Sequence, residues 1–431
     1  MTKINTFLCA AIILALLVSC EKKNRLLKID GNKGKEGLFE WQFPDEDHEQ
    51  AWLHYQYSVE KWWGDFPKDI KVPPNQYEYY AWAIGPFTKY EHNPVLAPTP
   101  GAWDKGRFGG GVHNGAIIVK DDVFYYIYRG EEPRQLKEKP GEMNDEKKEL
   151  NEEPKELEEK NVPPSWSYWY DLQIDYICDI GIATSKDGIH FEKDTINSPL
   201  FRKGENRKYS YEDANISKVG DIYYLFCNQW LWGNTDDLTQ NGTFLATSKD
   251  LLHWTPIGIV FPNAKRTHRN GVVLQNPNNE AVKVNGKYVM YLNFGLIAYS
   301  TDMIHWESQD NPNRWPGDEG CFALCDHAAN DPDHIVLFTG GNHTGHFYAI
   351  GEVLLSKKDL TKAIDYLPAP VLIANPRYPY EHGFTADAPY TPISMFSDCI
   401  FLNGITMYSG KWWVYYGGSE YYTCLATAIF K

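Results

Sequence analysis

Polar side chains stand at the start of five apolar, strand-like segments along the chain. These side chains are His113, Asn114, Glu212, Asp213, His268, Arg269, Asn270, Glu319, Glu381, His382 and Asp398. Carboxyl groups gathered from such positions could cleave a glycosidic bond. That reaction needs one acid to protonate the leaving oxygen and one carboxylate to activate water or attack directly. Repulsion between like charges in a low-dielectric site raises the pKa of one carboxyl and keeps the other ionised.

A repeated pattern predicts the fold that would bring these segments together. Residues 183–191, 246–254 and 298–306 are near copies of one another. Each copy joins an apolar strand to a turn centred on aspartate and then to a strand that opens with histidine and an aromatic residue. The intervals between the copies match one blade of a β-propeller with its loops.

Strand–turn–strand units complete the blades. Units at 116–130, 214–228 and 281–295 precede the three copies, and looser copies follow at 334–355 and 400–430. Tight turns and alternating apolar residues mark their strands as half-buried. We therefore predict an all-β, five-bladed β-propeller over residues 78–431, with residues 78–90 closing the ring against the C-terminus. The alternative, a β-sandwich, does not explain the recurring Ser-x-Asp-x-x-His-aromatic pattern.

The propeller prediction separates structural polar residues from chemical ones. The innermost strand of each blade begins near the central channel, so we expect the polar strand starts, Asp213 and Glu381 above all, to meet at one mouth. The aspartates and histidines of the copies recur at the same place in every blade, which favours a structural role in capping the turn and binding a neighbouring backbone group. These residues are Asp187, Asp250, Asp302, His190, His253 and His305.

Candidate binding residues lie beside the predicted mouth. Sugars are bound by planar side chains against the ring and by amide or guanidinium groups on the hydroxyls. The loop 228–232 supplies Trp230 and Trp232, and His113 and Asn114 follow three glycines that permit close backbone approach. His343 and His346 lack an evident third ligand, so no metal site is predicted. The sequence leaves open a structural calcium ion in the channel.

The whole chain sets the compartment and excludes some partners. Its net charge of −15 argues against nucleic acid binding.

Residues 1–20 have the pattern of a lipoprotein signal peptide. Lys3 precedes an apolar run at 7–18 that is too short to span a bilayer, and a small residue precedes Cys20. We expect lipidation at Cys20 and export to the periplasmic or cell-surface side of a bacterial membrane. Residues 21–77 would form a tether and N-terminal extension, and the charged segment 137–160 a solvated insertion. An ordinary signal peptide is the alternative.

The order of several motifs resembles glycoside hydrolase family 130. The motifs are HNGAIIVKDDVFYYIYRGEE, IGIATSKDGIHF, YEDANISKVGDIYYLF, HRNGVVL with KVNGKYVMY, PYEHG and WWVYYGGSEYYTCLATA. The resemblance implies a five-bladed propeller that acts on β-mannosides as a phosphorylase or a hydrolase. It also implies that Asp213 is the general acid and that Arg129 and Arg269 are the family's two motif arginines, with Arg129 contacting the sugar.

Two departures from the family pattern favour hydrolysis. The Pro-Arg of the acid motif is Ala214-Asn215 here, and the family's Tyr-His-Gly reads as residues 338–340, Phe-Thr-Gly. The family uses both positions for phosphate, so phosphate should be poorly held. Hydrolysis then needs a base, for which Glu381 is the first choice and Glu319 the second, in an inverting arrangement.

Two other functions stay open at the level of sequence. One is a family 43-type glycosidase with Asp104 as base, Asp213 as modulator and a glutamate as acid. The other is a non-catalytic, glycan-binding surface lipoprotein.

Overall fold

The computed structural model describes residues 77, 80–105, 111–135, 174–201, 208–231, 237–293, 295–311, 319–328, 331–343, 347–367, 370–374, 378–382 and 399–430. The chain divides into two compact units, Met1–Tyr79 and Tyr80–Lys431, and all described residues except Tyr77 belong to the second. The predicted signal peptide with Cys20, the charged segment 137–160 and nearly all of the extension at 21–77 lie outside the described residues. Within the described part of the chain, no helix has the length and apolar character needed to cross a membrane.

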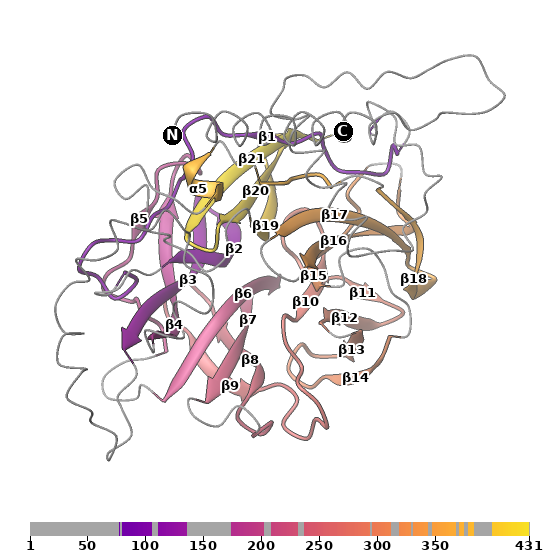
Figure 1. Ribbon diagram of the computed structural model, residues 1–431. Helices are drawn as coiled ribbons and strands as arrows, with labels where there is room; N and C mark the ends of the chain where they lie inside the picture. The colour runs from indigo at the N-terminus through magenta and orange to yellow at the C-terminus, as the bar shows by residue number, and fades with distance from the viewer. Residues whose placement is uncertain are drawn as a thin grey trace, which may run out of the picture. The chain divides into compact units, whose positions relative to one another are not determined.

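The strands group into five antiparallel blades around a common centre (Figure 1). Blade 1 consists of β2 (Val112–Lys120), β3 (Val123–Gln135), β4 (Ile174–Ser185) and β5 (Glu192–Lys193). Blade 2 consists of β6 (Tyr209–Val219), β7 (Ile222–Leu231), β8 (Gly242–Ser248) and β9 (Thr255–Ile259). Blade 3 consists of β10 (Val272–Gln275), β12 (Lys287–Leu292), β13 (Leu296–Ser300) and β14 (Glu307–Asp310), with β11 (Lys283–Val284) beside β12. Blade 4 consists of β15 (Glu319–Cys325), β16 (His334–His343), β17 (Phe347–Ser356) and β18 (Asp359–Tyr366). Blade 5 consists of β19 (Ile400–Tyr408), β20 (Lys411–Gly418), β21 (Tyr422–Ile429) and β1 (Thr88–Lys89).

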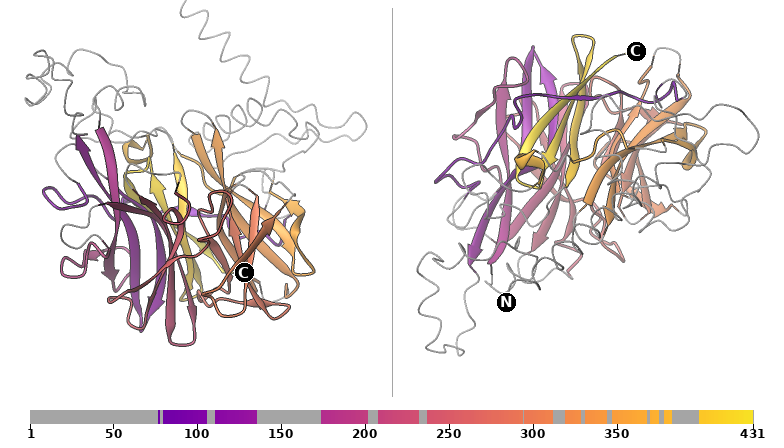
Figure 2. Two further views of the ribbon diagram at one scale, coloured as in Figure 1. Left: turned by 90° about the horizontal axis from the view of Figure 1, so that it is seen from below. Right: turned by 45° about the horizontal axis from the view of Figure 1, so that its top comes forward.

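The ring of blades is closed by strand pairing at its seam. Thr88 of β1 lies opposite Thr427 of β21, so an N-terminal strand completes the blade built by the C-terminus. This confirms the closing role predicted for residues 78–90. The first strands of the blades, β2, β6, β10, β15 and β19, contact one another in that order around the centre, and β19 returns to β2 (Figure 1). Figure 2 shows the blades from two further directions. β10 and β15 even pair in parallel, with Leu274 opposite Ala323.

Apolar side chains between neighbouring blades form the core. Ile118 of blade 1 and Leu225 of blade 2 belong to one buried cluster, and Leu324 of blade 4 and Leu402 of blade 5 belong to another. Burying such side chains gains about 25 cal/mol per Å² of apolar surface. The blades therefore hold one another in place, which fixes the positions of their first strands. The six described cysteines are buried and form no disulfide.

The repeated aspartate turns are structural, as predicted. The Oδ1 atom of Asp187 accepts hydrogen bonds from the backbone N–H groups of Ile189 at 2.9 Å and His190 at 2.8 Å. The Nδ1 atom of His190 lies 2.7 Å from Asp187 Oδ2. Asp250 and Asp302 repeat the same arrangement. One detail differs from the expectation: each histidine binds the carboxylate of its own turn and not a neighbouring backbone group.

A bulge interrupts the first strand of four blades. The pairing register shifts between His113 and Ala116, Glu212 and Asn215, Gly320 and Phe322, and Leu402 and Gly404. Asn114 and Asp213, inside two of these bulges, have φ values of 41° and 58°, and Asn270, just before β10, has φ of 52°. Asn and Asp are the side chains that tolerate this left-handed conformation best. Bulges re-aim side chains, and here they direct these residues to the centre of the ring.

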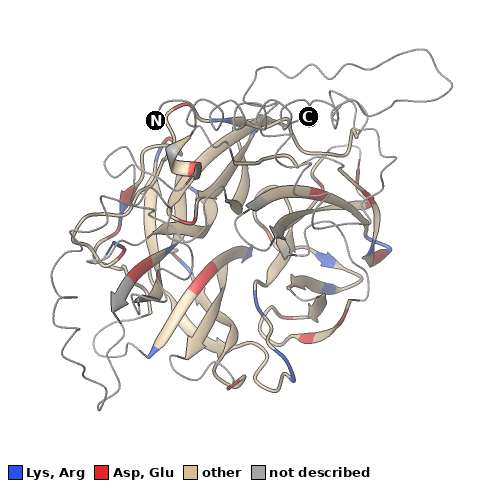
Figure 3. Ribbon diagram, viewed as in Figure 1, with Lys and Arg blue, Asp and Glu red and all other residues tan. Residues whose placement is uncertain are grey.

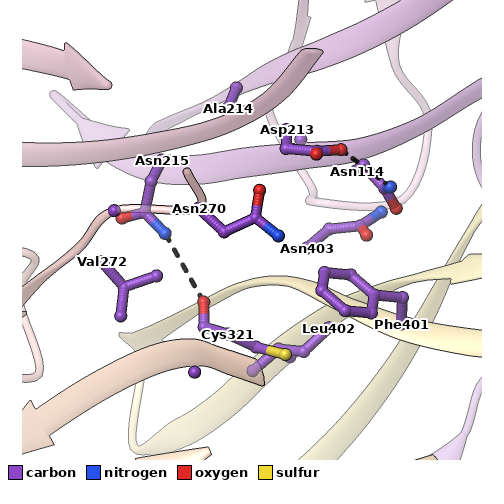
Figure 4. A pocket seen from close by; sticks show the side chains of 13 residues that line it. Asn114, Asp213, Ala214, Asn215, Asn270, Val272, Cys321, Phe401, Leu402 and Asn403 are labelled. Atoms are coloured by element: carbon purple, nitrogen blue, oxygen red, sulfur yellow. Dashed lines mark hydrogen bonds between the residues drawn. The ribbon is translucent and has the colours of Figure 1, made fainter. Parts of the chain in front are cut away.

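The bulges surround a small pocket at the centre of the ring. Its lining includes Asn114, Asp213, Asn270, Cys321 and Asn403, one residue from each blade (Figure 4). The first strands or strand starts of all five blades thus line one pocket, and three of the predicted residues, Asn114, Asp213 and Asn270, lie in it.

Candidate active site

Asp213 is the centre of a polar cluster contributed by three blades. Its Oδ1 atom accepts hydrogen bonds from Asn114 Nδ2 at 3.0 Å and Arg129 Nη1 at 3.1 Å. Its Oδ2 atom accepts one from Asn228 Nδ2 at 2.9 Å and lies 3.4 Å from Arg269 Nη2. Burial favours the neutral acid, but the two arginines outweigh it and hold the pKa of Asp213 below its usual range. These contacts therefore hold Asp213 as a carboxylate.

Arg129 of β3 links this carboxylate to two others. Its Nη2 atom lies 2.6 Å from Glu131, and its Nη1 atom lies 3.1 Å from Glu212 as well as from Asp213. Its Nε atom donates to the sulfur of Cys178 at 3.3 Å. Every nitrogen of the guanidinium group is thus engaged within the protein. Acidic residues on β3 and β6 appear in red in Figure 3.

Glu212 and Trp230 lie next to Asp213 and contact each other. The Trp230 Nε1 atom donates to Glu212 Oε1, and the Arg269 guanidinium lies 5.6 Å from the centre of the Trp230 ring. Burial raises the pKa of Glu212, with the adjacent Asp213 adding to the effect and Arg129 opposing it. Glu212 and Asp213 therefore form a carboxyl pair whose two pKa values are pushed apart, as acid–base chemistry requires.

His113, Asn114 and Asn270 complete the predicted cluster. The fully buried His113 ring lies 3.2 Å from Glu131. Asn228 donates to Asn270 Oδ1 at 2.5 Å, and the backbone N–H of Asn270 donates back to Asn228 Oδ1 at 2.9 Å. Of the predicted site residues, the structure thus brings together the following: His113, Asn114, Arg129, Glu212, Asp213, Trp230, Arg269 and Asn270.

Glu420 belongs to the same cluster and was not predicted. It is the middle one of the three residues between β20 and β21, where Ser419 and Glu420 have φ values of 50° and 51°. Burial raises the pKa of Glu420 to about 7; Glu131 and Asp213 add to the rise, and His113 and Arg129 oppose it. A sequence signal existed, because this type of hairpin turn favours Asn-Gly and the chain has Ser-Glu instead.

Glu381, the predicted base, is not available for that role in this arrangement. Its side chain is fully buried in α5 (Pro379–His382). One carboxylate oxygen lies 2.7 Å from Lys89 Nζ of β1, and the other accepts a hydrogen bond from Tyr416 Oη at 2.8 Å. The expectation that Glu381 acts beside Asp213 is therefore corrected: this carboxylate is held in a buried ion pair.

Two further predicted residues are also used structurally. The ring nitrogens of His268 lie 2.8 Å from Arg266 O and 2.7 Å from Ser308 Oγ, so neither is left for a sugar. Asp104 is buried and ion-paired with Lys193 at 2.5 Å. It contacts Tyr128, the neighbour of Arg129 on β3, and successive side chains of a strand point to opposite faces. Asp104 thus lies on the side of β3 away from Asp213, which removes its proposed role as base.

The structure does not describe the side chains of the remaining predicted residues. Glu319 begins β15 and His382 ends α5, but their side chains are outside the described features, as is that of His343. Trp232, His346 and Asp398 lie outside the described residues altogether. Among the residues that are described, no group of three or more His, Cys, Asp or Glu side chains is arranged to hold a metal ion.

Comparison with known proteins identifies the family. The glycosyl hydrolase family 130 model, described as beta-1,4-mannooligosaccharide phosphorylase, matches residues 166–430. A 1,2-beta-oligomannan phosphorylase of Thermoanaerobacter sp. (strain X514) is 30% identical over 282 residues, which cover 59% of this chain and 79% of that protein. A putative glycoside hydrolase from Parabacteroides distasonis has a TM-score of 0.57 at 23% identity, covering 81% of this chain and 97% of its own.

A solved structure described as one of the family 130 glycoside hydrolases that target β-1,2 mannosidic linkages in Candida mannan has a TM-score of 0.58. It is 21% identical to this chain and covers 80% of it and 94% of its own length. These likenesses agree with the propeller fold. Since the family model spans more than half of the sequence, the chain belongs to glycoside hydrolase family 130.

Proposed function

We propose that this protein hydrolyses β-mannosidic bonds in oligosaccharides, with water as the acceptor. The family membership supports an enzyme that acts on glycosidic bonds, and the related 1,2-beta-oligomannan phosphorylase supports a β-mannoside as substrate. The choice of water rests on the charge of the site. Among the described residues, four carboxyl groups, those of Glu131, Glu212, Asp213 and Glu420, face two guanidinium groups, those of Arg129 and Arg269.

An acidic site disfavours phosphate as the attacking group. Phosphate carries between one and two negative charges near neutral pH, and it binds where arginine or lysine charge is available. Arg129 is already shared among Glu131, Glu212 and Asp213. The arginine that the family has after its acid motif is Asn215 here, and its amide nitrogen lies 3.5 Å from the backbone oxygen of Cys321. This excess of carboxyl groups over guanidinium groups is the observation that carries the proposal.

The Glu212–Asp213 pair would supply the proton for the leaving group. The family resemblance assigns the acid role to Asp213, whose pKa is held below its usual range by Arg129 and Arg269. Glu212 beside it holds a proton to higher pH than an ordinary glutamate. In a coupled pair the proton belongs to both groups, so Glu212 is a local source from which Asp213 can be protonated when substrate binds. Trp230 offers its ring to the sugar, and Asn114 and Asn270 offer amides to its hydroxyls.

Phosphorolysis is the second candidate, because the relative with the 30% match is named a phosphorylase. The two reactions are separated by incubating the purified protein with β-1,2- and β-1,4-mannobiose, with and without inorganic phosphate. Hydrolysis predicts free mannose at a rate that does not depend on phosphate. Phosphate-dependent release of mannose 1-phosphate would refute the hydrolytic proposal, and the absence of any turnover would favour a glycan-binding protein.

We further propose that the enzyme is exported and anchored through lipid at Cys20. This rests on the sequence pattern of residues 1–20 alone. A lipid anchor would place the propeller at a membrane surface, where it could meet oligosaccharides from outside the cytoplasm.

A further inference from the structure

The turn between β20 and β21 holds Glu420 in a conformation that side chains rarely adopt. Tyr421 N donates to Gly418 O at 3.0 Å across the turn, and both central residues have positive φ. Glycine or asparagine normally occupies such positions, because other residues are strained there. Backbone strain of this kind persists where the surroundings impose it, and it is concentrated at functional sites.

Neighbouring groups impose this conformation. Ser419 N donates to Cys399 O at 2.7 Å, and Ser419 Oγ donates to the backbone oxygen of Glu381. Val112 N donates to Tyr421 O at 2.8 Å, which ties the turn to the start of β2. A Cβ atom on Gly111 would lie 2.8 Å from Glu420 O, so only glycine permits this close approach. The turn is therefore fixed against both α5 and blade 1.

The Glu420 carboxyl differs from every other acid of the cluster. Arg129 binds Glu131, Glu212 and Asp213. The partly exposed side chain of Glu420, in contrast, makes no hydrogen bond or ion pair with any residue in the described ranges, although His113, Arg129 and Asp213 lie close enough to interact with its charge. It is thus the one acid of the described cluster that can turn to a bound water or substrate without breaking an existing contact.

From this geometry we infer that Glu420 is the general base that activates the attacking water. The inference rests on the proposed hydrolysis. In the step, the water oxygen forms a bond to the anomeric carbon and its proton passes to the Glu420 carboxylate. The bond from that carbon to the leaving oxygen breaks, and this oxygen takes a proton from Asp213, which has first received that proton from Glu212. The products are a free sugar of inverted configuration and the shortened oligosaccharide, and solvent restores the proton balance.

Two substitutions test the inference. Glu420→Gln keeps the size of the side chain, and Glu420→Gly supplies the residue that the turn favours. We expect both variants to lose about 100- to 10,000-fold in kcat, with KM changed by less than about threefold. Glu420→Gly should melt at or above the wild-type temperature, so its loss of activity could not be assigned to unfolding. Glu91→Gln, at an exposed position, is the matched control and should retain wild-type activity.

Chemical rescue separates a base from other roles. Azide needs no deprotonation, so we expect it to restore turnover of an aryl β-mannoside by Glu420→Gly and to yield the α-mannosyl azide. Wild-type kcat/KM should rise with pH through about 7, because the base must be ionised. The variants should not show this rise of kcat/KM with pH.

The results that would contradict the role of Glu420 differ from the result that would contradict hydrolysis. Activity within threefold of wild type, a rise in KM at constant kcat, or failure of rescue would overturn the role of Glu420 while leaving the hydrolysis by the wild-type enzyme intact. A wild-type enzyme that requires phosphate would overturn the hydrolytic proposal itself, and this inference with it.

Discussion

Replacing Lys89 with methionine would leave the Glu381 carboxylate buried without its counter-ion. The Glu381 side chain is 0% exposed and that of Lys89 is 20% exposed, and their charged atoms are 2.7 Å apart. Breaking a buried pair by removing one partner costs about 3–5 kcal/mol. Because Lys89 still reaches solvent, we expect about 3 kcal/mol. For a domain of this size that corresponds to a fall in melting temperature of roughly 6 °C or somewhat less.

A double-mutant cycle distinguishes a structural Glu381 from a catalytic one. Lys89→Met, Glu381→Gln and the double variant are compared by thermal unfolding and by kcat at 25 °C on mannobiose. We expect the double variant to be more stable than Lys89→Met, since it no longer buries a carboxylate that has lost the charge of Lys89. All three should retain kcat within about tenfold, because Lys89 and Tyr416 already bind this carboxylate within the protein. A loss of more than 1,000-fold in kcat for Glu381→Gln, without a loss of stability, would show that Glu381 is a catalytic group after all.

Of the three other predictions, two follow from the structure and the third follows from the sequence. Asp213→Asn should keep the fold, since asparagine tolerates φ of 58°, but lose about 100- to 10,000-fold in kcat with sugar release as the assay; near-normal turnover would contradict an acid role. Burial raises the pKa of Glu352 well above its usual range, so folding retains a proton that the unfolded chain releases and stability falls as pH rises above about 4.3. Between about pH 5 and 8 the melting temperature should therefore fall less in Glu352→Gln than in wild type, and equal slopes would count against this reasoning. Cys20→Ser should abolish labelling with radioactive palmitate and release the protein from the membrane fraction, whereas unchanged labelling would rule out this anchor.

The fold could be predicted because its unit is repeated. The copies at 183–191, 246–254 and 298–306 carry the same aspartate turn for the same local reason, which is a carboxylate that caps two backbone N–H groups. Closure of the ring could also be predicted, since a strand at 78–90 had no other partner in the pattern. The repeated segments thus allowed the arrangement of distant strands to be predicted from short stretches of sequence.

The site could be predicted only in part, because strand starts were used as the guide. That rule found Asn114, Asp213 and Asn270, which the bulges of blades 1 and 2 and the turn before blade 3 direct inward. It failed in blade 5, where the acid that enters the cluster is Glu420 at a hairpin turn. Glu381 was favoured instead, because a sequence does not reveal that Lys89, from the distant N-terminal strand, is there to neutralise it.

The bulges explain why backbone geometry and chemistry select the same residues at the centre of the ring. A left-handed backbone position accepts Gly, Asn and Asp with least strain, and Asn and Asp are also side chains that bind sugar hydroxyls or transfer protons. Asn114 and Asn270 therefore satisfy both demands, and Asp213 adds a charge that two arginines stabilise. Glu420 satisfies only the chemical demand, since glutamate is not favoured at φ of 51°. A residue kept at the expense of backbone strain is better explained by its carboxyl group than by the turn it occupies.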